Sequence, residues 1–384
     1  MKKRLGDYIQ EYSVRNKSGE DIPVYSITNS QGFCRDYFSK EVASKDKTTY
    51  KIVPRGCFAY NPSRINVGSV DWQRDEERVI VSPLYNVFSV SPEIDQQYLY
   101  YYLKSSATLY RIKEVATGSV RDNLRLSMLY DFMIELPSLD VQRQIVSNLD
   151  LLASIIRQRN QQLTKLDELI KARFVEMFGD PIQNEKCWET KSLFDLGYCK
   201  NGMNFHKGDH GVEIHCLGVG DFKDRSTIHE VENLPFVSLN ESPDPDYLLQ
   251  DGDIVFVRSN GNKELVGRCL AIYPANVPVT YSGFCIRYRL TSKEASAAYL
   301  LRVLKADSVR KKMAGRGANI QNLNQQTLSQ LAIPLPPLSL QNQFADFVAE
   351  VDKSKLFVGS AAARKPLDLE FFSKGTVQRP IKEV

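Results

Sequence analysis

The chain has 384 residues, of which 42% are hydrophobic and 25% are charged, and its formal net charge is +4. This composition is typical of a soluble globular protein with two or three domains, and the mildly basic charge permits a nucleic-acid partner without requiring one. No apolar run approaches the ~20 residues of a membrane span, and the first residues lack the apolar stretch of a secretory signal. We therefore expect neither membrane insertion nor secretion.

Residues 1–137 are predicted to form a first domain. Segments such as "YKIVPRGCFAY" (50–60) and "ERVIVSPLYNVFSV" (77–90) combine β-branched and aromatic residues with Gly, Pro and Asn breaks, which indicates strands and loops. A short helix over 96–115, a polar loop and a buried strand, "FMIEL", follow. The domain ends in "LPSLDVQRQI" (136–145), whose proline disfavours helix before it and favours helix entry after it.

A long spacer helix is predicted over 138–181. Its apolar residues follow alternating steps of four and three, a heptad seam about 33 residues long that only Arg159 and Arg173 interrupt. Gly179 and Pro181 end it, and its balanced charges favour a protein partner over phosphate. The seam consists of Ile145, Leu149, Leu152, Ile156, Leu163, Leu166, Ile170 and Met177.

Residues 182–336 repeat the order of the first domain. Strand-rich segments, "DIVFVRS" and "VPVTYSGFCIRYRL", precede a helix over 297–315, a polar loop, the strand "LAIPL" and the phrase "LPPLSLQNQF" (335–344). A second, short spacer helix is predicted over 337–358, with Phe344, Val348 and Val351 on its seam. Gly and Pro residues then stop the helix, so 359–384 is predicted to be an irregular tail.

The two halves follow one plan. A shift of 199 positions aligns ten identical residues within 27 columns around the Leu-Pro phrase, far above the ~5–6% per column expected from average composition. The predicted fold class is therefore α+β, with two similar β-rich domains separated by helices. Equivalent seams predict that the two spacer helices pack on each other; one long amphipathic core helix is the alternative.

Polar loops at equivalent places in the two domains are the candidate binding surfaces. Arg can bind guanine bidentately, Asn or Gln can bind adenine, and Lys and Arg on the preceding helices can neutralise phosphates. One such stretch is more often solvated surface, but recurrence in two divergent domains favours two readers of two DNA sequences. The candidates are Asn61, Arg64, Arg111, Lys113, Arg121, Asn123 and Arg125 in the first domain, and Arg258, Asn260, Asn262, Lys263, Lys311, Lys312, Arg316, Asn319 and Asn322 in the second.

Signals for catalysis or metal binding are weak. All four histidines fall within 206–229, but their spacing is poor for zinc, so we favour satisfied loop histidines. The "LGVGD" stretch lacks a third glycine, and no nuclease, methyltransferase or Ser-His-Asp arrangement can be assembled. The seven scattered cysteines, without a C-x-x-C pair, favour reduced thiols and a cytoplasmic location.

The sequence resembles the specificity subunit of bacterial Type I restriction–modification systems. The resemblance rests on "IPLPPLSLQNQFADFVAEVDKSK" (333–355), "KLDELIKARFVEMFGDP" (165–181) and "LGDYIQEYSVRNKSGEDIPVYSITNSQGF" (5–33). It covers about residues 3–358. It implies two target recognition domains related by pseudo-two-fold symmetry, each reading half of a split DNA target, with the helices forming an antiparallel coiled coil that sets the gap.

The resemblance also implies partners and cofactors. The chain would be non-catalytic and would bind no cofactor, and it would dock two methyltransferase subunits and be joined by translocating endonuclease subunits. S-adenosylmethionine, ATP and Mg would act on those partners. The short second spacer departs from the family pattern and puts full assembly in doubt, so a truncated or silent variant is an alternative. Further alternatives are a repeat scaffold that does not bind DNA and a cryptic enzyme.

Overall fold

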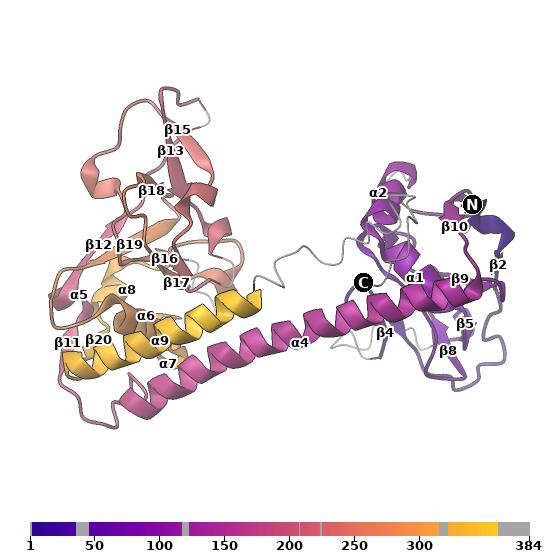
Figure 1. Ribbon diagram of the computed structural model, residues 1–384, viewed down its shortest axis with the longest axis horizontal. Coiled ribbons are helices and arrows are strands. Elements are labelled where there is room, and N and C mark those ends of the chain that lie inside the picture. The colour runs from indigo at the N-terminus through magenta and orange to yellow at the C-terminus, as the bar shows by residue number, and fades with distance from the viewer. Residues whose placement is uncertain are drawn as a thin grey trace, which may run out of the picture. The chain divides into compact units, whose positions relative to one another are not determined.

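A computed structural model describes residues 2–35, 46–116, 123–206, 208–222, 225–314 and 322–359. The chain divides into two compact units: unit 1 comprises the described residues up to Asn160, and unit 2 comprises Gln161–Gly359 (Figure 1). Each unit combines sheets with helices, which confirms the predicted α+β class. In the described part of the chain, no helix is long and apolar enough to cross a membrane.

Unit 1 is built around an antiparallel sheet with the strand order β2-β9-β6-β7. Three antiparallel pairs, β1–β10, β3–β4 and β5–β8, complete its strands. The strands are β1 (Lys2–Arg4), β2 (Ile9–Glu11), β3 (Ser26–Thr28), β4 (Gly32–Cys34), β5 (Lys51–Pro54), β6 (Phe58–Tyr60), β7 (Val70–Trp72), β8 (Arg78–Val81), β9 (Asn86–Val90) and β10 (Met133–Glu135).

The helices of unit 1 cover this sheet with apolar side chains. Tyr98 and Leu99 of the first helix share a buried cluster with Phe58 and Phe88, whose rings stack at 5.2 Å on neighbouring strands. The helical elements are η1 (Leu5–Asp7), η2 (Ile65–Val67), α1 (Gln96–Lys104), α2 (Ser106–Val115), α3 (Leu126–Leu129) and the first part of α4 (Leu139–Phe178).

The single helix predicted over 96–115 is two helices. Ser105 has extended backbone (φ −65°, ψ 145°), and its side chain accepts a hydrogen bond from the Thr108 amide, which caps α2. The helix predicted over 297–315 is broken at the equivalent place, where Ala306 is extended (ψ 138°). Both predictions of one continuous helix are therefore wrong, because an extended residue separates two short amphipathic helices.

Unit 2 contains a five-stranded sheet in the order β12-β19-β16-β17-β14 and a three-stranded sheet in the order β15-β13-β18. A short pair, β11–β20, matches β1–β10 of unit 1. The strands are β11 (Thr190–Ser192), β12 (Gly197–Asn201), β13 (Val212–Leu217), β14 (Thr227–Ile228), β15 (Phe236–Leu239), β16 (Asp253–Val257), β17 (Cys269–Ile272), β18 (Val279–Tyr281), β19 (Cys285–Leu290) and β20 (Ala332–Pro334).

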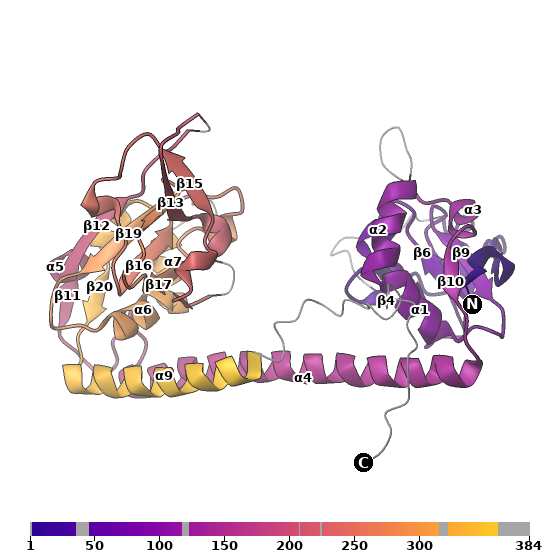
Figure 2. The same ribbon diagram turned by 45° about the horizontal axis from the view of Figure 1, so that its top comes forward.

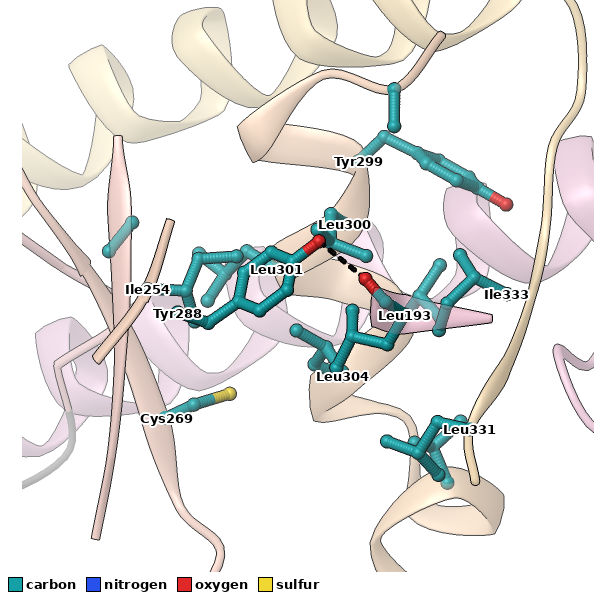
Figure 3. Packing of buried hydrophobic residues seen from close by; sticks show 14 of the residues in the cluster. Leu193, Ile254, Cys269, Tyr288, Tyr299, Leu300, Leu301, Leu304, Leu331 and Ile333 are labelled. Atoms are coloured by element: carbon teal, nitrogen blue, oxygen red, sulfur yellow. Dashed lines mark hydrogen bonds between the residues drawn. The ribbon is translucent and has the colours of Figure 1, made fainter. Parts of the chain in front are cut away.

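Figure 3 shows the main core of unit 2, in which Leu300, Leu301 and Leu304 of the helix after β19 lie among the side chains of the sheet. The Tyr288 hydroxyl donates a hydrogen bond of 2.8 Å to the Leu193 carbonyl, which ties β19 to the start of the short helix Leu193–Leu196. The helical elements are α5 (Leu193–Leu196), η3 (Val219–Asp221), η4 (Val231–Asn233), η5 (Pro245–Tyr247), η6 (Lys263–Leu265), α6 (Ala297–Lys305), α7 (Asp307–Ala314), α8 (Gln325–Ser329) and α9 (Leu338–Gly359).

The repeated Leu-Pro phrase makes the same contacts twice. Buried Gln142 donates to the carbonyls of Glu93 and Pro137 and accepts from the Asp95 amide. Buried Gln341 makes the same three bonds with Glu294, Pro336 and Ser296. Each glutamine thus ties the start of a spacer helix to the loop ahead of α1 or α6, which explains why the phrase occurs twice.

Within unit 2, α9 runs antiparallel to the last part of α4 (Figures 1 and 2). The Phe344 ring lies 5.5 Å from the rings of both Phe174 and Phe178, and Lys355 Nζ lies 2.6 Å from Asp167 Oδ1. The predicted seam residues of this region share one apolar cluster: Leu166, Ile170, Met177, Phe344, Val348 and Val351. The predicted seam did not include Phe174 and Phe178, which directly follow Arg173 and Met177 in the sequence.

The first part of the seam has a different partner from the predicted one. Leu149 is buried against Tyr101 of α1, and Ile145 packs on the same cluster. These two residues therefore attach the first part of α4 to unit 1. Leu152 is 49% exposed, and no residue from 150 to 169 is buried in the described structure. The prediction that the two helices pack along the whole seam is therefore wrong. They pack only near the C-terminal end of α4, because α9 has 22 residues and α4 has 40.

Candidate nucleic-acid interface

In unit 1, three segments distant in sequence meet where β6 ends. The Leu124 amide donates to the Pro62 carbonyl (3.1 Å), and the Tyr60 hydroxyl donates to the Leu124 carbonyl (3.1 Å). Asn86, which starts β9, donates from Nδ2 to the Tyr60 hydroxyl at 2.9 Å. We call residues 60–66, 82–86 and 123–125 the loop edge of unit 1.

The equivalent segments meet in unit 2. The Leu323 amide donates to the Arg258 carbonyl (2.7 Å), and the Arg258 amide donates to the Phe284 carbonyl (2.8 Å). Ser259 forms an isolated antiparallel bridge with Asn322. We call residues 257–263, 282–285 and 322–324 the loop edge of unit 2.

Asparagine side chains shape both loop edges. Asn61 Oδ1 accepts hydrogen bonds from the Ser63 amide (3.1 Å) and hydroxyl (3.0 Å). Asn260 accepts from the Asn262 amide (2.8 Å), and Asn262 accepts from the Glu264 amide (3.1 Å). Such local bonds hold tight turns, so the carboxamide oxygens of these three predicted DNA-contact residues have a structural role.

The exposed predicted residues at the loop edge of unit 1 are Arg64, Asn123 and Arg125. In unit 2, Asn262 and Asn322 are exposed, while Arg258 is half-buried and its Nη1 donates to the Gly283 carbonyl at 3.4 Å. Each edge therefore presents polar donors of the kind that hydrogen-bond to bases, but with different side chains in the two units.

The predicted cations on the helices divide into two groups. Lys113 on α2 and Lys311 and Lys312 on α7 are exposed. Arg111 is also exposed, and its guanidinium lies 4.7 Å from the centre of the Phe132 ring and donates to the Asp131 carbonyl, so its DNA contact stays a prediction. Arg121, Arg316 and Asn319 lie outside the described residues, as does the side chain of Lys263.

Two lysines at equivalent positions of α1 and α6, Lys104 and Lys305, are half-buried. Lys104 Nζ donates to the Asn29 carbonyl (2.8 Å), and Lys305 Nζ donates to the Ser226 hydroxyl (2.9 Å). Burial lowers the pKa of both ammonium groups. These lysines tie helices to loops and are poor candidates for phosphate contacts.

Sequence reasoning missed the turns Ser82–Asn86 and Ser282–Cys285, which complete the loop edges. Burial raises the pKa of Tyr85, whereas a hydrogen bond with Asn61 and the positive charge of Arg64 lower it. The turn of unit 1 therefore lies against the predicted polar loop. The signal was present, because Ser82 and Ser282 align at a shift of 200, each two residues before a large apolar residue.

The histidines do not form a metal centre with their neighbours in the described residues. No group of three or more His, Cys, Asp or Glu side chains there is placed to hold a metal ion. The His215 ring lies 4.0 Å from the Phe236 ring and shares a hydrogen bond with the Leu234 carbonyl. His206 and His210 line a surface pocket of about 330 Å³ with Phe205.

The structure thus contains two units of one design, with different side chains at equivalent loop edges. The family model for the Type I restriction modification DNA specificity domain matches residues 6–165 and 186–357. The chain therefore belongs to the family of Type I restriction–modification specificity subunits, which confirms the resemblance found in the sequence.

The curated relatives include the Type I restriction enzyme StySPI specificity subunit of Salmonella potsdam. It is 26% identical over 279 residues, which are 68% of this chain and 58% of that protein. The EcoKI specificity subunit of Escherichia coli K12 is 23% identical over 274 residues, 67% of this chain and 58% of that protein. The chain thus spans less than two thirds of the length of these relatives.

Solved structures show the same fold. One, from work on complex assembly and conformational transition of the Type I system, covers 94% of this chain and 91% of its own, with a TM-score of 0.52 and 16% identity. The S subunit from M. genitalium covers 94% and 92%, with a TM-score of 0.50 and 14% identity. At these identities the likeness concerns the fold alone.

Proposed function

We propose that this chain recognises a split sequence in double-stranded DNA, with the loop edge of each unit reading one half. The chain would contribute no catalytic group, and it would direct methyltransferase and endonuclease subunits to the site. S-adenosylmethionine, ATP and Mg would serve the chemistry of those partners. The spacer helices α4 and α9 would carry the partner contacts.

The observation that carries this proposal is the recurrence of one loop edge with different side chains. In both edges, a leucine amide donates a backbone hydrogen bond to the loop that follows a strand of the sheet. Leu124 donates to the loop after β6, and Leu323 donates to the loop after β16. At those loops, unit 1 has Arg64 exposed and unit 2 has Asn262 exposed. A common frame with variable donors is what two different base sequences require, because base edges are distinguished by their donor and acceptor patterns.

The distribution of charge supports the same function. The exposed cations Lys113, Lys311 and Lys312 lie on the helices that adjoin the loop edges: α2 contacts η2, and Arg310 of α7 donates to the Glu264 carbonyl of η6. Cations beside base-reading loops position a duplex through its phosphates. The modest net charge of +4 fits a subunit whose partners share the enclosure of DNA.

Methylome sequencing tests this function. The chain would be co-expressed with its cognate methyltransferase subunits in a host that lacks adenine methylation, and we expect methylation at one split motif. Replacing Arg64 and Arg125 together by Ala should abolish or relax one half of the motif, since each lost base contact costs roughly 1–3 kcal/mol.

The matched control is Arg15→Ala, an exposed arginine of unit 1 outside the loop edge. It should leave the motif intact. Two outcomes contradict the proposed function: methylation that follows no split motif, and absence of methylation although the complex with the methyltransferase subunits assembles.

A further inference from the structure

Each loop edge carries one large apolar side chain that the polar predictions ignored. Leu84 is 79% exposed and Phe284 is 62% exposed. A single exposed apolar residue is ordinary on a protein surface and needs no explanation. Two at equivalent positions of a repeated frame are a different case, because the other side chains at the loop edges differ between the units.

The same turn presents both side chains. In unit 1, the Tyr85 amide donates to the Ser82 carbonyl (3.0 Å), and the Leu84 amide donates to the Ser82 hydroxyl (3.4 Å). In unit 2, the Cys285 amide donates to the Ser282 carbonyl (2.8 Å), and the Phe284 amide donates to the Ser282 hydroxyl (3.3 Å). A serine that accepts from the amide two residues on fixes a four-residue turn, and the apolar residue is its third member.

The turn of unit 2 is held firmly in place. The Gly283 amide donates to the Met203 carbonyl (2.8 Å), and a Cβ at Gly283 would lie 2.1 Å from Asn204 Oδ1, so a larger residue there would displace the Asn204 side chain. The Phe284 carbonyl accepts from the amides of Arg258 and Ser259 at 2.8 and 3.3 Å. Phe284 is therefore an exposed ring on a supported turn, in direct contact with a predicted base-reading loop.

The turn of unit 1 has equivalent neighbours. Leu84 precedes Tyr85, which is hydrogen-bonded to Asn61 and feels the charge of Arg64. Both turns thus lie beside a loop that carries guanidinium and carboxamide groups. A surface for an apolar protein partner would instead be continuous and apolar, so the surroundings favour nucleic acid over protein.

We propose that Leu84 and Phe284 are specificity-determining residues that contact the apolar surface of bases, one in each half of the DNA target. This inference rests on the proposed function. The apolar surface is either the 5-methyl group of thymine in the major groove or the face of a base at an opened step. Leucine in one unit and phenylalanine in the other would then contribute to the difference between the two half-sites.

The test begins with selection from a randomised duplex pool by the full-length chain at low salt, followed by sequencing. The wild-type chain should enrich a split motif. Phe284→Ala should lose preference in one half of the motif and Leu84→Ala in the other, each with about 5- to 100-fold weaker binding to the wild-type motif. Phe236→Ala and Leu151→Ala remove side chains that are 60% and 59% exposed away from the loop edges, and they should change neither half.

Two modified duplexes identify the base surface contacted. If a methyl group is the contact, replacing thymine by uracil in the affected half should weaken DNA binding by the wild-type chain but not by Phe284→Ala. If a base step is opened, the fluorescence of 2-aminopurine placed in the affected half should increase when the wild-type chain binds, but not when Phe284→Ala binds. Either result supports the inference.

The inference and the proposed function fail in different ways. A wild-type motif that Leu84→Ala and Phe284→Ala retain at full affinity overturns the inference and leaves the proposed function standing. So does a motif that is retained while binding of methyltransferase subunits is lost, because the turns would then be protein contacts. If the wild-type chain enriches no sequence, the proposed function fails and the inference fails with it.

Discussion

At the scale of single residues, Gln142 and Gln341 fix the entry of each spacer helix. Each is fully buried, and each satisfies two carbonyls and one amide of its own unit. Buried polar groups without partners are costly, so a glutamine in this position fixes the entry of the spacer helix only if all three bonds form together.

Gln341→Leu should lower the free energy of unfolding of unit 2 by roughly 2–4 kcal/mol, because it leaves one amide and two carbonyls unsatisfied. Urea denaturation followed by the fluorescence of Trp188 measures this in a Trp72→Phe background, since these are the two tryptophans of the chain. Gln343→Leu, an exposed position of the same phrase, is the control and should change stability little. Equal effects of the two variants would show that the buried bonds contribute nothing specific.

At the scale of elements, contact between α4 and α9 is concentrated where aromatic rings meet. Phe344 is fully buried and touches the rings of Phe174 and Phe178. Next along the pair, Lys355 bridges Asp167 of α4 and Asp352 of α9 at 2.6 and 3.0 Å. Because Asp167 is 61% exposed, we expect the rings rather than this ion pair to hold the helices together.

Phe344→Ala should destabilise unit 2 by roughly 3–5 kcal/mol, the usual cost of removing a buried phenylalanine. Phe357→Ala, at an 80% exposed position of the same helix, should change stability by no more than about 0.5 kcal/mol. Thermal unfolding of the two variants gives the comparison. If Phe344→Ala melts with the wild-type chain, α9 is not held by its aromatic contacts.

At the scale of the whole molecule, the two units share a frame but not a complete sheet. The order β2-β9-β6-β7 of unit 1 corresponds to β12-β19-β16-β17 of unit 2, which adds β14 and the sheet β15-β13-β18. Each sheet takes all its strands from one unit, so a change of sequence in one unit removes no strand from the sheets of the other.

Exchange of residues 185–333 for the matching unit of another family member should therefore change one half of the methylated motif and keep the other. The sheet of unit 1 contains no strand from the exchanged segment, so its loop edge should keep its geometry. Methylome sequencing of the exchanged chain with its methyltransferase subunits measures the outcome. A change in both halves would contradict independent recognition by the two units.

The sequence predicted local and repeated features well. The shift of 199 positions and the Leu-Pro phrase indicate the duplicated frame from the sequence alone. One prediction was wrong because it extended a pattern beyond its contacts: Leu149, predicted to lie on an inter-helix seam, packs on Tyr101. Periodicity shows which side of a helix is apolar, but not what covers it.

By itself, then, the sequence determined the family, the α+β class and the repeat, because these depend on composition, period and motif. Only the tertiary structure brought residues 60–66, 82–86 and 123–125 to one edge, and likewise their counterparts in unit 2. The physical reason is that hydrogen bonds between strands and loops distant in the chain place these side chains. No local pattern reports such bonds, so the sequence alone does not place Leu84 and Phe284 beside the predicted polar loops.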